Sequence, residues 1–351
     1  MQIEEITPSL IDGRPHPGLV DVVDLWRRWG EAVLGHDDFQ HGPLGLAHQL
    51  RELPSVRQRL FVARDGKRVV GSIQLGLSLT DNLHLADLEP CVDPNADPAA
   101  VLGTLWSELQ PVLSAEGRTA VSVWTTSSLE TGPDPLTPVT GSGRVQRDAT
   151  ADWLLDNGFL LDQVERAGLL RLDGSPDFVA QLSDAEPHSA AYHLVQWKGI
   201  TPEPLREPMA MLRGRMSTDV PKGDLPMEAE RWDAERVLAL DSRHADGGQT
   251  DLWTVAVHSD TGEPVAHTYL GMPQEKPEVA WQEDTLVRPD HRGHRLGMRI
   301  KAANLLQLRA GHPAVRRVRT WNADENAPML AINDALGFRP DAVEGLWVWR
   351  A

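Results

Sequence analysis

The residues with the clearest chemistry lie in one stretch of the second half, where a strand-forming run leads into a turn rich in arginine and glycine. The stretch reads Trp281-Gln-Glu-Asp-Thr-Leu-Val-Arg-Pro-Asp-His-Arg-Gly-His-Arg-Leu-Gly297. Pro289 keeps Arg288 out of the helical region, and apolar residues return at helical spacing from Ile300 onward. A strand, a tight turn and a helix are therefore expected. The free N–H groups at the start of that helix would form an anion site.

The same turn is cationic in a chain whose formal net charge is -17. A local patch of the opposite sign indicates a bound polyanion such as a phosphate ester, and Gly293 and Gly297 would let it approach the backbone closely. An ordinary strand-to-helix connection with solvated arginines is the alternative. The patch sets five cations against Asp290, namely Arg288, Arg292, Arg295, Arg299 and Lys301.

Two motifs in this half resemble those of a known family. Residues 287–297 resemble the acetyl-CoA pyrophosphate loop of the GNAT N-acetyltransferases, V-x-P-x-x-[QR]-G-x-G-x-[GA], with Arg295 at the usual middle glycine. Residues 322–338 are similar to the family's closing element, N-x-x-A-x-x-x-Y-x-x-x-G-F, with Asn326 in the first slot and Asn333 at the tyrosine. The resemblance covers Tyr192 to Ala351 well and the first half faintly.

The resemblance implies acetyl-CoA as the acyl donor and places it on named residues. The turn would hold the pyrophosphate, and the end of the strand would pair by backbone with the pantetheine arm, so that the N–H of Val287 becomes the candidate oxyanion donor. Asn322 and Asn326 could donate amides to the pantetheine or the acetyl carbonyl, or serve as helix caps. The expected cofactor-binding residues are Leu286, Val287, Arg292, Gly293, His294, Arg295, Leu296, Gly297, Asn322, Asn326 and Met329.

An amine acceptor also needs a base, because it arrives mostly as ammonium. Glu283 and Asp284 alternate along the strand, so only one is expected to face the cleft. Asp284 is the first candidate base and Glu283 the second, with Asn322 as a third catalytic residue. Either carboxylate could instead be solvated or ion-paired. Asn333 cannot protonate the leaving thiolate, which leaves water or a substitute acid: His267, His294 or Tyr269.

Composition sets the class of protein. A length of 351 residues with 41% apolar residues suggests about two domains with normal cores. The single cysteine, Cys91, excludes an intramolecular disulfide, and no apolar span or signal peptide is apparent, so a cytoplasmic protein without a membrane partner is expected. The acidic balance argues against nucleic acid and is compatible with cationic substrates or simply with solubility. His291 and His294 make a poor metal site, and no metal is expected.

The order of expected elements in the first half parallels that in the second. The chain is therefore interpreted as an α/β protein of two tandem GNAT-like domains, each a twisted mixed β-sheet flanked by α-helices. Residues 1–175 would form a degenerate, structural copy and residues 190–351 the copy with the acetyl-CoA site. In the first copy, residues 92–100 offer two aspartates and no glycine where pyrophosphate would sit, and Leu154 stands at the tyrosine slot.

The sequence thus predicts an N-acetyltransferase that moves an acetyl group from acetyl-CoA to a primary amine of a small molecule. A non-catalytic acyl-CoA-binding or sensing protein is the alternative, favoured by Asn333 and the degenerate first copy. A protein-lysine or N-terminal acetyltransferase is a third reading. A homodimer is left open. The loop 217–226 is either a lid over the acceptor pocket or a connector.

Overall fold

The structure is a computed structural model that describes all 351 residues. The elements of the first half are β1 Gln2–Glu5, β2 Leu10–Ile11, β3 Arg14–Pro15, α1 Pro17–Val33, α2 Pro43–Gln49, β4 Val56–Asp65, β5 Arg68–Ser78, β6 Leu85–Val92, α3 Pro98–Ala115, β7 Ala120–Ser128, α4 Ala149–Asp156 and β8 Leu160–Arg171. Between the halves lie α5 Phe178–Ala185 and the short 3-10 helix η1 Glu186–Ser189.

The second half repeats this order with its own elements. They are β9 Tyr192–Lys198, α6 Glu203–Gly214, α7 Met216–Asp219, α8 Ala234–Asp246, β10 Gln249–His258, β11 Pro264–Pro273, β12 Val279–Val287, η2 Pro289–His291, α9 Leu296–Gly311, β13 Arg317–Ala323, α10 Ala327–Leu336 and β14 Arg339–Arg350. None of the helices combines the length and apolar character that a membrane crossing requires.

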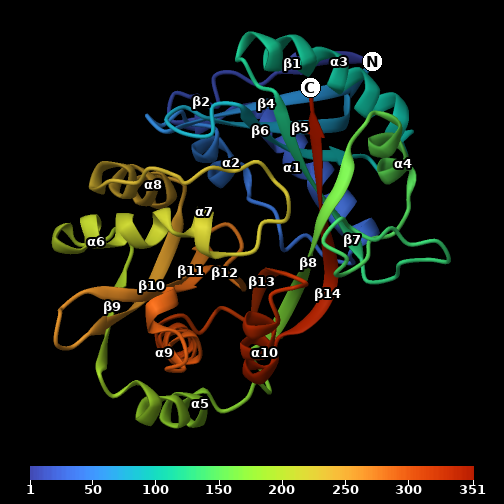
Figure 1. Ribbon diagram of the computed structural model, residues 1–351. Helices are drawn as coiled ribbons and strands as arrows, with labels where there is room; N and C mark the ends of the chain where they lie inside the picture. The colour runs from blue at the N-terminus through green and yellow to red at the C-terminus, as the bar shows by residue number, and fades with distance from the viewer.

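One sheet of twelve strands runs through both halves, in the order β1-β4-β5-β6-β7-β14-β8-β13-β12-β11-β10-β9. Helices cover both faces of it, so the expected α/β class is confirmed (Figure 1). In the second half, α9 packs on one face through Leu305 and Leu308. Helix α6 packs on the other face, where Met209 and Leu212 contact Trp253. We call these the α9 face and the α6 face.

The two halves exchange their last strands. The C-terminal strand β14 pairs with β7 of the first half, whereas β8 pairs with β13 of the second, and β8 and β14 pair with each other. Figure 1 shows β14, in red, running up beside β8 to end near the start of the chain. The proposed division at residues 175–190 therefore separates the chain by sequence, while the sheet itself crosses that division.

Each half contains one pair of parallel strands that separates partway along. In the first half, β6 and β7 pair from Leu85↔Ala120 to Leu88↔Val123 and then diverge. In the second, β12 and β13 pair from Val279↔Arg317 to Gln282↔Thr320 and then diverge. Both splits leave strand edges without a neighbouring strand, and the N–H and C=O groups there are available to a ligand.

Most expected elements are present. The sequence alone indicates a strand from Ala167 to Leu172 and a helix from Glu228 to Leu240, and both begin elsewhere in the structure. Strand β8 begins at Leu160. Helix α8 begins at Ala234, because Asp233 caps it and the preceding segment is held against the first half. The junction at 173–189 contains a helix, α5, which packs beside α9.

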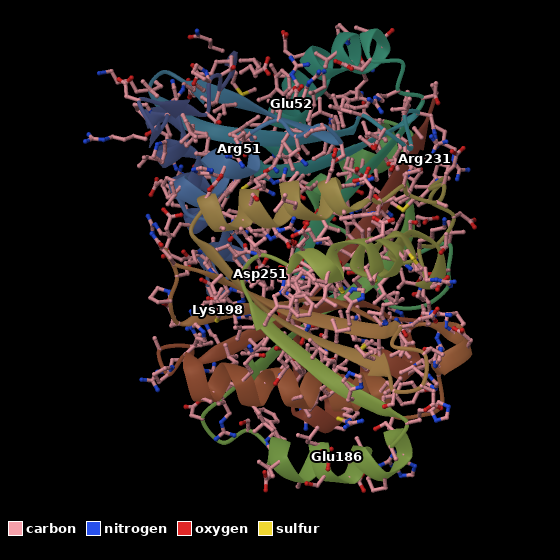
Figure 2. The ribbon with its side chains drawn as sticks, turned by 90° about the vertical axis from the view of Figure 1, so that its left-hand side faces the viewer. Arg51, Glu52, Glu186, Lys198, Arg231 and Asp251 are labelled. Carbon is pink, nitrogen blue, oxygen red and sulfur yellow. The ribbon has the colours of Figure 1, made fainter.

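Charged contacts also join the halves. Asp38, which is 1% exposed, accepts hydrogen bonds from Arg317 and Arg319 of β13, and its backbone oxygen accepts one from the indole of Trp281. Arg51, labelled in Figure 2 where the first half meets α8, pairs with Asp246 at 2.7 Å. These contacts hold the sheet faces of the two halves in one fixed arrangement.

Candidate functional site

The turn after β12 presents a row of free backbone donors. The N–H groups of the six consecutive residues 293–298 make no hydrogen bond to any backbone or side-chain acceptor. Residues 292–295 are exposed, and they lead directly into the first turn of α9, the positive end of a helix of 16 residues. Such an arrangement is a ready site for a phosphate or pyrophosphate.

Backbone conformation explains why the turn contains glycine at two positions and why it tolerates Arg295 where the family usually has glycine. Gly293 has φ +85, with open space where a Cβ would stand, so its amide is accessible from outside. Arg295, at the position of the family's middle glycine, takes the left-handed φ of +53 that glycine adopts freely. Gly297 serves packing, because a Cβ there would lie 2.9 Å from Ile332 of α10. The departure at Arg295 therefore leaves the loop conformation in place.

The arginines around the turn are mostly engaged by the protein itself. Arg288 pairs with Asp290, Arg295 pairs with Asp184 of α5, and Arg299 donates to the backbone oxygens of Ser189 and Tyr192. Arg292 donates only to backbone oxygens, those of Val287 and Asp219. Lys301 points away from the turn and is 1% exposed, and burial lowers its pKa to about 7. The five cations therefore do not form one free patch, and the N–H groups of residues 293–298 are the donors that the protein leaves open.

The open edge of β12 has a further backbone donor, which faces the gap where β12 and β13 separate. Arg288 donates its N–H to Val265 on β11, so alternation turns the N–H of Val287 toward the side where β13 has diverged. Leu286 is 2% exposed and packs in the core on the α6 face, which leaves only its backbone for a ligand. Val287 packs beside Leu296 on the α9 face.

Across the split, polar groups of β13 and α10 form a small network. Asn333, in the tyrosine slot, donates from Nδ2 to Oδ1 of Asn322 at 2.5 Å, which leaves the amide NH₂ of Asn322 free to donate. The Oδ1 of Asn333 is buried and accepts no hydrogen bond. Asn326 caps α10 by accepting from the N–H of Met329 at 3.4 Å, while its own NH₂ stays free. Met329 is half-buried at the start of α10.

A β-bulge changes the expected placement of the two carboxylates. Thr268 pairs with Thr285 and Leu270 pairs with Gln282, so Glu283 and Asp284 together oppose the single residue Tyr269. Gln282 and Thr285 share the α9 face with their partners, and both intervening carboxylates lie on the α6 face. The expectation that they point to opposite faces was therefore wrong, because alternation fails at a bulge.

Both carboxylates are half-buried and neither forms an ion pair, so the ion-pair alternative is not what holds them. Burial, with the neighbouring Asp284 as a second cause, raises the pKa of Glu283 to about 8. Burial also raises the pKa of Asp284, against a lowering effect of Arg213. A carboxylate whose pKa approaches neutrality is matched to a general-base role at physiological pH.

The three candidate acids lie in different environments. His267 is fully buried, neither ring nitrogen has a hydrogen-bond partner, and burial lowers its pKa to about 3. Tyr269 stacks on Trp253 with ring centroids 4.2 Å apart, and burial raises its pKa well above the usual value. His294 is exposed on the turn itself, with its ring beside that of Tyr192. Of the three, His294 is the one in contact with solvent.

The corresponding turn of the first half is closed by its own side chains. Asp93 accepts hydrogen bonds from the N–H of Asn95 and from Arg28 and Arg68. Asp97 takes the N–H of Ala99 at the start of α3. Carboxylates thus hold the donors that a phosphate would need, which agrees with the expected degeneracy of this copy.

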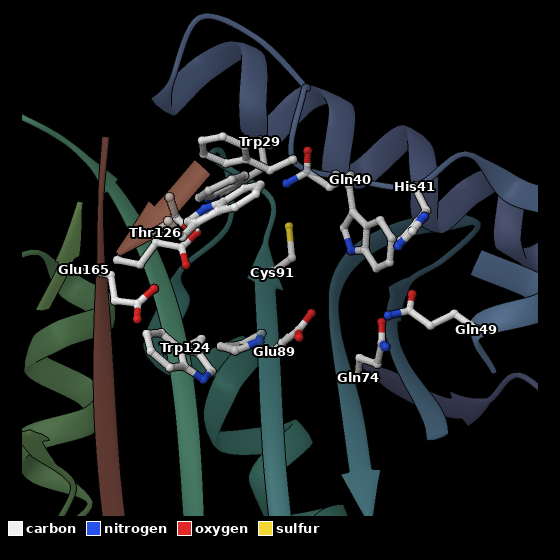
Figure 3. Close-up of a pocket in the computed structure, with 15 residues that line it drawn as sticks. Trp29, Gln40, His41, Gln49, Gln74, Glu89, Cys91, Trp124, Thr126 and Glu165 are labelled. Atoms are coloured by element: carbon white, nitrogen blue, oxygen red, sulfur yellow. Dashed lines mark hydrogen bonds between the residues drawn. The ribbon is translucent and has the colours of Figure 1, made fainter. Parts of the chain in front are cut away.

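One hollow between the two halves was not anticipated from the sequence. A cavity of about 390 Å³ lies below α1 on the α6 face of the sheet, and Figure 3 shows Trp29, Glu89, Trp124 and Glu165 around it. Residues from both halves line it, since Trp321 lies on β13 and Glu344 on β14. A comparison of the two halves could have found part of it, because Glu89 and Glu283 each follow the last parallel pair of their half.

Solved structures of other proteins share this fold. A tandem GNAT protein from the clavulanic acid biosynthesis pathway, in a form without AcCoA, is 26% identical and matches with a TM-score of 0.74 over 99% of this chain and 98% of that one. A GCN5-related N-acetyltransferase from Sphaerobacter thermophilus (TM-score 0.59, 14% identity, 97% and 96% coverage) and a glucosamine N-acetyltransferase region of a fungal GH3 β-N-acetylglucosaminidase (0.58, 14%, 99% and 38%) share the fold alone. No family model and no curated protein matches the sequence.

Proposed function

Because this chain belongs to the GNAT superfamily in its tandem two-domain form, we propose that its second half transfers an acetyl group from acetyl-CoA to an amine. The observation that carries the proposal is the row of free N–H groups at residues 293–298, directly beyond a split pair of parallel strands. Neither feature is needed to hold the fold together. Six consecutive N–H groups without an acceptor at a helix N-terminus fit the diphosphate of coenzyme A.

The residues around the split would hold the rest of the donor. The open edge of β12 at Thr285–Val287 matches the repeating amides of a pantetheine arm, and the free amide of Asn322 faces it from β13. When bound, acetyl-CoA supplies an activated acetyl thioester. The N–H of Val287 is the group we assign to stabilise negative charge on the carbonyl oxygen.

Glu283 and Asp284 would take the proton that the amine loses. In the net reaction a C–N bond forms, the C–S bond breaks, one proton passes from the nitrogen to a carboxylate, and coenzyme A leaves as the thiol after protonation by water or His294. Since both carboxylates lie on the α6 face, the acceptor would approach from that face. Asp284 remains our first candidate and Glu283 the second; burial raises the pKa of both, and that of Glu283 to about 8.

The test is release of free thiol from acetyl-CoA in the presence of a panel of amines. We expect release with at least one primary amine and none with the corresponding alcohols. The alternative function, a non-catalytic acyl-CoA sensor, is favoured by the loss of the tyrosine at Asn333. Tight acetyl-CoA binding by calorimetry together with no thiol release from any amine would establish that alternative and refute the transferase.

A further inference from the structure

The cavity below α1 has walls of aromatic rings. Five of its lining residues are large aromatics drawn from α1, the following loop, β7 and β13: Trp26, Trp29, Phe39, Trp124 and Trp321. Its volume of about 390 Å³ is within the usual range for small-molecule sites. Aromatic faces attract cations as well as apolar groups, so the walls alone are compatible with either kind of ligand.

The acidic residues that line the cavity favour a cationic ligand over an apolar one. Glu89 of β6, Glu165 of β8 and Glu344 of β14 line it, and none of them forms an ion pair. Elsewhere in the protein, the enclosed carboxylates of Asp38, Asp81, Asp93 and Asp241 are each paired with an arginine, whereas Asp162, which is 3% exposed, has no ion pair. Of the three cavity acids, Glu165 and Glu344 are half-buried and Glu89 is exposed. Clustered carboxylates without a counter-charge either take up protons or attract a cation from outside.

Hydrogen-bonding groups on the cavity are also incomplete. Gln74 is 4% exposed, points into the cavity in Figure 3, and its carboxamide oxygen accepts no hydrogen bond. The carboxamide oxygen of Gln40 on the opposite wall is buried and also has no partner. Buried acceptors are nearly always paired in folded proteins. The buried, unpaired oxygen of Gln40, the free oxygen of Gln74 and three carboxylates without an ion pair therefore favour a ligand that donates hydrogen bonds and carries positive charge.

The cavity shares part of its wall with a second hollow that lies nearer the proposed catalytic carboxylates. His41 and Gln49 line both hollows, and the second one is also lined by Arg243, Tyr269 and Glu283. Burial lowers the pKa of His41 to about 4, so this ring adds no positive charge between the two hollows at neutral pH. A ligand anchored among the aromatic rings would have to pass His41 and Gln49 to reach Glu283.

We propose that this cavity binds an organic cation with at least two amino or guanidino groups, one held by Glu89, Glu165 and Glu344 among the aromatic rings, and that this cation is the acetyl acceptor. The claim that a cation binds here is argued from the cavity alone. The claim that this cation is the acetyl acceptor rests on the proposed function. The anchored group would meet carboxylates and aromatic faces, while the second amine would reach toward Glu283 and Asp284.

Binding is tested first on the full chain without acetyl-CoA, by calorimetry and tryptophan fluorescence, with spermidine and agmatine as cationic probes. Hexane-1,6-diol and adipate are the neutral and anionic controls. We expect saturable binding of a cationic probe only, weakened about tenfold or more by Glu344→Gln and by Glu89→Gln. Glu108→Gln, which removes the same charge from the exposed face of α3, should leave the affinity unchanged.

Titration of the three cavity carboxylates provides a second measurement, which separates binding in the cavity from non-specific attraction of cations to the protein surface. Burial and Glu325 raise the pKa of Glu165 to about 7, and burial and Glu165 raise that of Glu344 to about 8. Burial and Asp87 also raise the pKa of Glu89. A bound cation would lower all three, so binding at pH 7 should release protons and strengthen as the pH rises toward 8. Calorimetry in buffers of different ionisation enthalpy counts these protons.

Two results would overturn the proposal: no cationic probe binds at millimolar concentration, or the diol binds as well as the cations. Equal weakening by Glu108→Gln would overturn it too. If a cation binds in the cavity but its complex releases no thiol from acetyl-CoA, the binding site is supported and the acceptor assignment is refuted. If uncharged or monofunctional amines are acetylated while no cation binds, the transferase is supported and the cavity proposal is refuted.

Discussion

Replacing Glu344 by glutamine should make the protein more stable at high pH. The carboxylate accepts hydrogen bonds from Thr126 at 3.1 Å and from the indole of Trp321 at 2.9 Å, both at Oε1, and glutamine can keep an oxygen there. Burial and the nearby Glu165 raise its pKa from 4.5 to about 8. A raised carboxyl pKa means that the folded state favours the proton. The associated stability is present below pH 4.5 and is lost as the pH rises through about 8.

The size of the effect follows from that rise in pKa. If the whole rise in the pKa of Glu344 were expressed as a change in unfolding free energy, it would correspond to about 5 kcal/mol. Glu344 is half-buried beside a hollow that water can enter, and screening reduces this change to about 1–2 kcal/mol. We expect equal unfolding temperatures at pH 5 and a Tm about 2–4 °C higher for Glu344→Gln at pH 9. Glu108→Gln is the control. Parallel Tm profiles for the variant and the unsubstituted protein would refute our account of the unpaired carboxylates.

Three further predictions concern other parts of the molecule. Gly293→Glu should weaken acetyl-CoA binding at least about tenfold in calorimetry with the Tm nearly unchanged, while Gly311→Glu at the far end of α9 should not; equal effects would contradict the placement of the diphosphate. Asp284→Asn or Glu283→Gln should lower kcat and remove the acidic limb of the pH-rate profile, where the rate falls as the base takes up a proton, without changing acetyl-CoA affinity; a profile kept by both variants clears them of the base role. Asp38→Asn should cost about 3 kcal/mol of unfolding free energy, because Arg317 and Arg319 lose the buried carboxylate they share and Arg319 keeps only Asp341 as a partner, and Asp12→Asn should cost almost none.

The features that depend on local sequence were predictable. Pro289, Gly293 and the apolar repeat of α9 encode a strand, a turn and a helix with few alternatives, and the turn has that shape with its amides free. Even the departure at Arg295 is explained by its backbone, which takes the left-handed conformation without glycine. Short-range rules therefore predicted the shape of this turn and its free N–H groups almost completely.

Features that depend on pairing were not predictable. The bulge at Glu283–Asp284 exists because two residues of β12 oppose one residue of β11, and nothing in either strand alone reveals that register. The exchange of β14 and β8 has the same cause, since both strands could in principle have closed their own half. The cavity was not predictable for the same reason. Its acidic residues lie close together only because β8 and β14 are exchanged between the halves.

The contrast between the two halves bears on what the first half is for. In its turn, Asp93 and two arginines satisfy internally the donors that an anion would need, whereas the second half leaves its donors open. On the α6 face the halves remain alike, because Glu89 and Trp124 stand in the same relation to their strand split as Glu283 and Trp321 do to theirs. A merely structural domain has no need to keep an unpaired carboxylate and a tryptophan on a cavity, since an apolar filling would be more stable. The first half thus has a turn whose donors are taken by its own carboxylates, and an acidic face that resembles that of the second half; this is the arrangement that the proposed cationic acceptor would require.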